Sequence, residues 1–145
     1  MRPPRPPRLP DWTIRLAALL ADWNARPFAW GQTDCAMLAA EAVVALTGVD
    51  PVADLRGSYS DATGAGRVLG AAGGLLALVA KMADRAGIPE CPPAFAQRGD
   101  VALVEWQGAQ ALGIVMPDGV MVLGRDEPRM LHVIPASSIR FAWAV

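Results

Sequence analysis

The sequence changes its hydrophobic periodicity once, at the proline-rich segment 88–93, and this change limits the possible folds. Before the segment, apolar residues recur at helical spacing, and glycines or prolines mark the expected helix ends. After it, short apolar runs alternate with turn segments, which is typical of strands joined by tight connections. Helices followed by successive strands predict an α+β domain, with N-terminal helices packed on a C-terminal antiparallel sheet of about five strands.

The same signals predict where the individual elements lie. Helices are expected at about 12–25, 35–46, 61–71 and 75–86, with a short helical turn at 51–55 after Asp50-Pro51. Strands are expected at 101–106, 110–116, 120–124, 130–134 and 140–144, and segment 88–93 is expected to be a rigid connector. Asp11 is the expected cap of the first helix, whose apolar stripe contains Ile14, Leu16, Ala17, Leu19, Leu20 and Trp23.

The composition limits the kind of protein. A chain of 145 residues that is 53% hydrophobic is large enough to bury one core, so we expect a single domain over 11–145. The net charge of −1 gives no general attraction to nucleic acid. Charged residues interrupt the long apolar runs, so the sequence predicts neither a membrane span nor a signal peptide.

Residues 1–10 form a separate arginine- and proline-rich arm. Its prolines exclude a helix and favour an extended polyproline II conformation. Arg2, Arg5 and Arg8 recur every three residues and would therefore lie along one edge of such a segment. Two interpretations stay open: a docking arm for an acidic or aromatic surface, and a solvated, poorly ordered terminus.

The stretch Phe28-Ala-Trp-Gly-Gln-Thr-Asp-Cys35 leads into the apolar helix expected at 35–46. Asp34 or Thr33 can cap this helix, and Asp34 is interpreted as a cap rather than a catalytic acid because aspartate is favoured there. Cys35 then lies in the first helical turn, where the helix dipole and free N–H groups would favour a nucleophilic thiolate or hold an oxyanion. The alternative interpretation is that Cys35 is a small buried hydrophobic residue.

Further motifs follow in a fixed order. Arg98-Gly-Asp-Val-Ala-Leu103 and Leu112-Gly-Ile-Val115 come after the Trp30-Gly and Asp34-Cys35 pairs. Together these motifs resemble the NlpC-type papain-like cell-wall peptidases, and the chain looks closest to short phage and prophage tail proteins of that superfamily. The resemblance implies a papain-like fold in which the cysteine heads a helix packed on an antiparallel sheet. It also implies Cys35 as the nucleophile and peptidoglycan as the substrate class.

The sequence departs from this family at the expected base. The family's histidine precedes the apolar-Gly-Ile motif, and that position is Ala111, which cannot accept a proton from Cys35. The tyrosine often found two residues before the tryptophan is Phe28. The single histidine, His132, lies on another expected strand, where it is either a half-buried structural residue or a relocated base. Whether the chain is an enzyme is therefore left open by the sequence.

No metal or cofactor site is predicted. Two cysteines, Cys35 and Cys91, and one histidine match no zinc-binding spacing, and the sequence does not show whether the two cysteines form a disulfide. Phosphate-binding glycine motifs and the serine-hydrolase elbow do not occur, so nucleotide binding and serine hydrolysis have no support.

Three functions are compatible with this pattern. The resemblance together with Ala111 favours a structural component of a phage or prophage tail tip, which would assemble in the host cytoplasm, reside in the virion and contact other tail-tip or hub proteins. The alternative is an active cysteine hydrolase for peptidoglycan stem peptides, with Cys35 as nucleophile and His132 as base. A binding module for glycan or peptide would use Trp30 and Tyr59 in the same cleft without chemistry.

Overall fold

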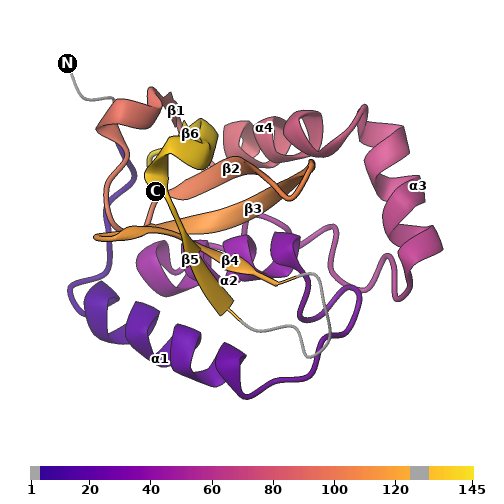
Figure 1. Ribbon diagram of the computed structural model, residues 1–145, viewed down its shortest axis with the longest axis horizontal. Helices are drawn as coiled ribbons and strands as arrows, with labels where there is room; N and C mark the ends of the chain where they lie inside the picture. The colour runs from indigo at the N-terminus through magenta and orange to yellow at the C-terminus, as the bar shows by residue number, and fades with distance from the viewer. Residues whose placement is uncertain (1–3, 125–130) are drawn as a thin grey trace.

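The structure, a computed structural model, describes residues 4–124 and 131–145. Within these residues the chain forms four α-helices and a six-stranded antiparallel sheet (Figure 1). The helices are α1 (Trp12–Asn24), α2 (Cys35–Thr47), α3 (Ala62–Ala72) and α4 (Leu75–Arg85). The strands are β1 (Glu90–Cys91), β2 (Val101–Trp106), β3 (Ala109–Met116), β4 (Gly119–Leu123), β5 (Leu131–Ile134) and β6 (Ile139–Trp143).

The strand order across the sheet is β1-β6-β2-β3-β4-β5. Strands β2 to β5 form a meander of neighbours, but β6 returns to pair with β2, and β1 pairs with the outer edge of β6. The α+β class with an antiparallel sheet is therefore confirmed. The papain-like assignment stays a prediction.

The expected number of strands was too low by one, because segment 88–93 is not only a connector. Glu90 and Cys91 pair with Trp143 and Ala142 and form β1. Prolines on both sides limit this strand to two residues, since proline cannot donate to a strand ladder. A run this short carries no visible periodicity, so this strand could not be predicted from the sequence.

Two hydrophobic clusters lie on the two faces of the sheet. On β2, Val101 and Leu103 belong to the larger cluster, which includes residues of α1, α2 and α4; we call this side the helix face. The neighbouring residues Ala102 and Val104 belong to the smaller cluster on the opposite side, the far face. Figure 1 shows α1 and α2 side by side, whereas α3 lies at the edge of the molecule away from the N-terminal arm.

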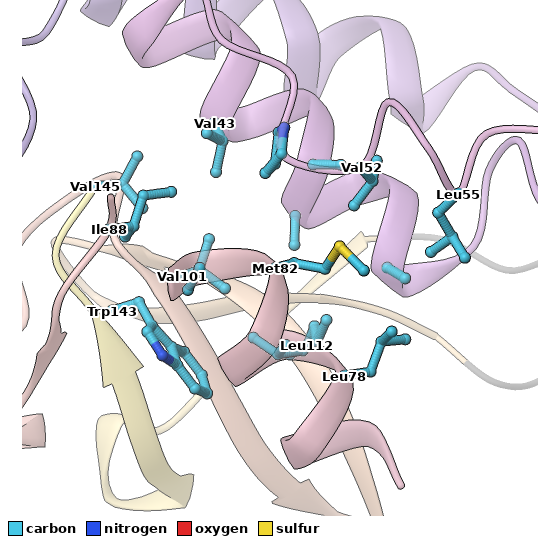
Figure 2. Close-up of a pocket in the computed structure, with 16 residues that line it drawn as sticks. Val43, Val52, Leu55, Leu78, Met82, Ile88, Val101, Leu112, Trp143 and Val145 are labelled. Carbon is cyan, nitrogen blue, oxygen red and sulfur yellow. The ribbon is translucent and has the colours of Figure 1, made fainter. Parts of the chain in front are cut away.

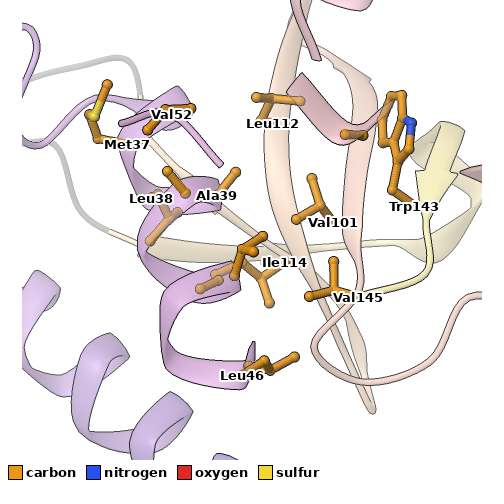
Figure 3. Close-up of a cluster of buried hydrophobic side chains, with 14 of the residues drawn as sticks. Met37, Leu38, Ala39, Leu46, Val52, Val101, Leu112, Ile114, Trp143 and Val145 are labelled. Carbon is orange, nitrogen blue, oxygen red and sulfur yellow. The ribbon is translucent and has the colours of Figure 1, made fainter. Parts of the chain in front are cut away.

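Helix α2 forms the centre of the helix-face cluster, as its apolar sequence predicts. Its buried residues are Met37, Leu38, Ala39, Ala40, Ala42, Val43 and Leu46. Figure 3 shows this cluster between α2 and the strands, with Ile114 and Val145 on the strand side. The helix ends at Gly48, whose φ of +77° is a left-handed conformation that glycine adopts without steric cost.

Two expectations for the N-terminal helices are wrong in detail. Ile14 and Ala17, which were assigned to the apolar stripe of α1, are exposed, and Ile14 is 71% exposed. The buried stripe follows Leu16, Leu20 and Trp23 at spacings of four and three. Asp11 stands at the N-cap position, but its side chain makes no capping bond and accepts from Arg15 Nε at 2.8 Å instead.

The expected helical turn after Asp50-Pro51 is present as a single turn. The Asp50 side chain accepts from the Val52 N–H at 3.1 Å, and the Val52 carbonyl accepts from the N–H groups of Leu55 and Arg56 at 2.8 and 3.1 Å. Arg56 then returns toward α2 and pairs with Asp50 at 2.6 Å and with Glu41 at 2.8 Å. These two ion pairs hold the 50–56 segment against α2.

The N-terminal arm folds back onto the domain. Arg5 and Arg8 both donate to Asp100 Oδ1, at 2.7 and 3.1 Å, and both donate to the Val145 carbonyl oxygen, at 3.0 and 2.8 Å. The Leu9 N–H donates to the Leu46 carbonyl at 2.7 Å. Arg5 and Arg8 thus dock on the acidic Asp100, and Arg8 also stacks over the Trp12 ring, as the docking interpretation of the arm expects; the surface that they contact belongs to the same chain. Arg2 lies outside the described residues, as do positions 125–130 between the β4 and β5 strands.

Asp100 is the residue on which the arm converges. Its side chain is fully buried and also accepts from the backbone N–H groups of Gln97 at 2.8 Å and Val145 at 3.1 Å. Burial lowers the pKa of the Arg8 guanidinium, while the Asp100 carboxylate acts in the opposite direction. Asp100 therefore joins the arm, the turn before β2 and the segment after β6.

Candidate functional site around Cys35

The candidate site begins with Asp34, which caps α2 and organises the loop before it. Its Oδ1 atom accepts from the Met37 N–H at 2.9 Å, which confirms the predicted cap. Its Oδ2 atom accepts from the Gly31 N–H at 2.8 Å and from the Tyr59 hydroxyl at 2.6 Å. The carboxylate is 4% exposed, so these three donors replace the water that it would otherwise bind.

The loop that presents Asp34 is held by local bonds and by a close backbone approach. Thr33 Oγ1 accepts from the Ala29 N–H at 2.6 Å and donates to the Pro27 carbonyl at 2.8 Å. Gly31 has a φ of +78°, and a Cβ atom there would collide with the Tyr59 carbonyl oxygen. The Trp-Gly pair of the motif is thus explained by contact with the segment that carries Tyr59.

Cys35 occupies the first position of α2 and faces β3. The N–H of Leu112 on β3 and the N–H groups of Cys35 and Ala36 lie near its sulfur. Burial nevertheless raises the pKa of the Cys35 thiol, and the neighbouring Asp34 carboxylate adds to the rise, while the three N–H groups act against it. The helix end was expected to favour a thiolate, but in these surroundings the protonated thiol is the stable form at neutral pH.

Tyr59 completes the polar part of the site. Burial raises the pKa of its hydroxyl, and the hydrogen bond to Asp34 and the nearby Cys35 add to this effect. The hydroxyl therefore remains a neutral donor to Asp34. The sequence indicated Tyr59 only as an aromatic residue near the cleft. It lies 25 positions after Asp34, and the segment between them carries no signal that the two side chains meet.

The two positions considered for a base do not face the thiol. Cys35 packs on the helix-face cluster, whereas Ala111 packs on the far-face cluster, so the side chain at position 111 starts on the other side of the sheet. On β5, Leu131 packs on the helix face, which directs the next residue, His132, to the far face. There the His132 ring lies 6.0 Å from the Trp106 ring, centroid to centroid. The structure thus brings Asp34 and Tyr59 to Cys35, but not His132.

The structure also shows the surroundings of the other residues that the sequence motifs single out. Phe28 makes an edge-to-face contact with Trp30, with centroids 5.1 Å apart. Cys35 and Cys91 are both free thiols and lie on opposite faces of the sheet. Within residues 4–124 and 131–145, no group of three His, Cys, Asp or Glu side chains could hold a metal ion.

A pocket, which we call the Cys35 pocket, opens beside the thiol and contains about 380 Å³ of empty space, part of it open to solvent. Its polar lining comes from Asp34, Cys35 and Tyr59, and Trp30 forms part of the wall. The rest is aliphatic: Ala36, Leu55, Ala65, Val68, Leu69, Leu75 and Leu78. The pocket can hold a small, largely apolar group next to the thiol.

The fold and the site define an α+β domain whose central helix is capped by Asp34 and begins with a protonated cysteine, Cys35. The model of the family described as "Domain of unknown function (DUF6950)" matches residues 7–145, so the chain belongs to that family. Comparison with curated proteins finds no match, and comparison with solved structures finds none either. Among the described helices none is alone long and apolar enough to cross a membrane, and α3 and α4 meet that criterion only as a pair bent by 71°.

Proposed function

We propose that the chain is a non-catalytic papain-like module that serves as a structural component of a phage or prophage tail tip. The order of the Trp-Gly, Asp-Cys, Gly-Asp and Gly-Ile motifs supports the papain-like part of this proposal. The same resemblance supports the tail-tip part, with other tail-tip or hub proteins as partners and the virion as the final location.

The observation that carries the non-catalytic part is the placement of the thiol relative to its possible bases. Cysteine hydrolases need a base within about 2.6–3.2 Å of the proton that it removes. Ala111 offers no acceptor atom, and His132 lies on the far face beside Trp106. Asp34 already accepts three hydrogen bonds, and its charge opposes ionisation of Cys35.

Incubation with purified peptidoglycan tests the loss of catalysis. The wild-type protein and the Cys35→Ser variant should release the same, background amount of peptide or amine, since no general base activates the thiol. A Cys35-dependent release would establish the alternative, a cysteine hydrolase in which the N–H groups near the sulfur hold the oxyanion. Retention of the protein on intact sacculi without release would instead identify a wall-binding module.

Fractionation of particles tests the structural role separately. The protein expressed with tail components should co-purify with assembled tails and remain bound at moderate salt. A protein that stays a free monomer, absent from the particles, would contradict the tail-tip assignment whatever the result with peptidoglycan.

A further inference from the structure

A second pocket lies beneath α4 and is lined only by apolar residues; we call it the α2–α4 pocket. About 520 Å³ of empty space, part of it open to solvent, lies between α2, α4, the loop after α2 and the sheet. Figure 2 shows Val43 of α2, Leu78 and Met82 of α4, and Leu112 and Trp143 of the sheet around it.

The space exists because the side chains that α2 turns toward it are small. Ala36, Ala39 and Ala40 line the pocket where larger side chains would close a helix interface. On the other wall, Val79 and Met82 of α4 stay only partly buried. Protein interiors are normally filled, and an unfilled apolar space loses the dispersion contacts of its lining. An occupant that supplies those contacts would therefore stabilise the fold.

The α2–α4 pocket and the Cys35 pocket are neighbours, because Ala36, Leu55 and Leu78 line both. Taken together, the two pockets are aliphatic over most of their lining, and their polar side chains lie together in the Cys35 pocket. Such a distribution fits a ligand with a long apolar part and one polar end.

The charge at the polar end limits what that end can be. Asp34 is a buried carboxylate whose three donors are all neutral groups. A second carboxylate next to it would be repelled and would also lose its own hydration. An uncharged end, such as a hydroxyl, meets neither penalty.

We propose that the two pockets together bind a straight aliphatic chain with an uncharged end. The chain lies between α2 and α4, and its polar end lies beside Asp34, Cys35 and Tyr59. This site is independent of whether the domain belongs to a tail tip, because it rests on the lining of the two pockets alone.

Calorimetry with the purified chain and n-alkanols tests the proposal. From 1-octanol to 1-decanol, each added methylene should tighten binding about fourfold, because each contributes a constant increment of buried apolar area. Decanoate should bind at least tenfold more weakly than 1-decanol, and Asp34→Asn should reduce that difference. Ala40→Leu, which fills the pocket from α2, should weaken 1-decanol binding about tenfold or more, whereas Ala17→Leu on the exposed side of α1 should not.

Three results would overturn the site: no saturable binding, affinity independent of chain length, or equal affinity in the wild type and a folded Ala40→Leu variant. If Ala40→Leu does not fold, NMR on the wild-type protein replaces it. Protons of bound 1-decanol should then show contacts to methyl groups of Leu78, Met82 and Leu112. Contacts confined to other parts of the surface would refute the assignment.

Discussion

Two buried aspartates, Asp34 and Asp100, stand immediately before an element of the core, yet their surroundings differ in charge. Asp100 is bound by two guanidinium groups, from Arg5 and Arg8, as well as by two backbone N–H groups. Asp34 is bound only by neutral donors, two backbone N–H groups and the Tyr59 hydroxyl. The first is a compensated charge, and the second is not.

This difference separates the structural roles of the two residues. Asp100 holds the arm against β2 and the segment after β6, and its charge adds to the effect of burial that raises the pKa of Cys91. Asp34 holds no cation, and its charge adds to the effect of burial that raises the pKa of both Cys35 and Tyr59. An aspartate before a cysteine on a helix thus makes the thiol less acidic here, although the helix end alone would have the opposite effect.

The largest effect is expected from Asp100→Asn, which removes the compensated charge. Arg5 and Arg8 would keep their partly buried positions without a counter-charge, and breaking a buried pair in this way costs about 3–5 kcal/mol. Urea denaturation should show a loss of unfolding free energy in this range. Asp54→Asn is the matched control, because its exposed pair with Arg85 should contribute little. Equal effects of the two substitutions would contradict the central role of Asp100.

Asp34→Ala tests the uncompensated charge and should have two separate consequences. Loss of the cap and of the bond from Tyr59 should lower the unfolding free energy by about 2–3 kcal/mol. At the same time the pKa of Cys35 should fall, because a negative neighbour has been removed. In a Cys91→Ser background, the alkylation rate of Cys35 as a function of pH measures this fall. An unchanged or higher thiol pKa would show that burial alone sets it.

Tyr59→Phe should have a smaller effect, because it removes one of the three donors to Asp34. We expect a loss of about 1.5–2 kcal/mol in unfolding free energy, at the lower end of the range for one hydrogen bond to a charged group. A double-mutant cycle with Asp34→Ala isolates the bond, since Tyr59→Phe should cost little once the carboxylate is gone. A full effect in that background would assign the loss to packing rather than to the hydrogen bond.

The comparison of the two aspartates also shows what could be predicted from the sequence. The cap by Asp34 was predicted, because it depends on a backbone N–H three residues away, and the bond from the Gln97 N–H to Asp100 is equally local. The guanidinium pair on Asp100 and the Tyr59 bond to Asp34 could not be predicted, because these partners lie 92–95 and 25 residues away. Local periodicity predicted the helices and five of the strands for the same reason.

The faces of the sheet mark a further limit of the sequence. Alternation along β3 and β5 was visible, but which set of residues meets the helices depends on the packing of α2 on the sheet. As a result, the motif resemblance could single out position 111 for comparison, whereas the location of Ala111 on the far face could not be predicted. The strand order could not be predicted for a similar reason. β6 pairs with β2 in the sheet, although β3, β4 and β5 lie between the two strands in the sequence.

The smallest expected effect is a change of stability with pH that comes from Cys35. A folded-state pKa above the unfolded value means that the folded protein holds its proton after the unfolded chain has lost it. Folding stability is therefore fully present below the unfolded thiol pKa of about 8.5–9 and falls as the pH rises above it. Between pH 7.5 and 9.5 the loss should amount to about 1 kcal/mol for one thiol.

Because the pKa of Cys91 is also raised, both proteins compared should carry Cys91→Ser. In that background, the chain with Cys35 should lose about 1 kcal/mol more than the chain with Cys35→Ala over this interval. Parallel pH profiles for the two chains would mean that the thiol ionises as easily in the folded domain as in the unfolded chain, and that Asp34 does not restrain it.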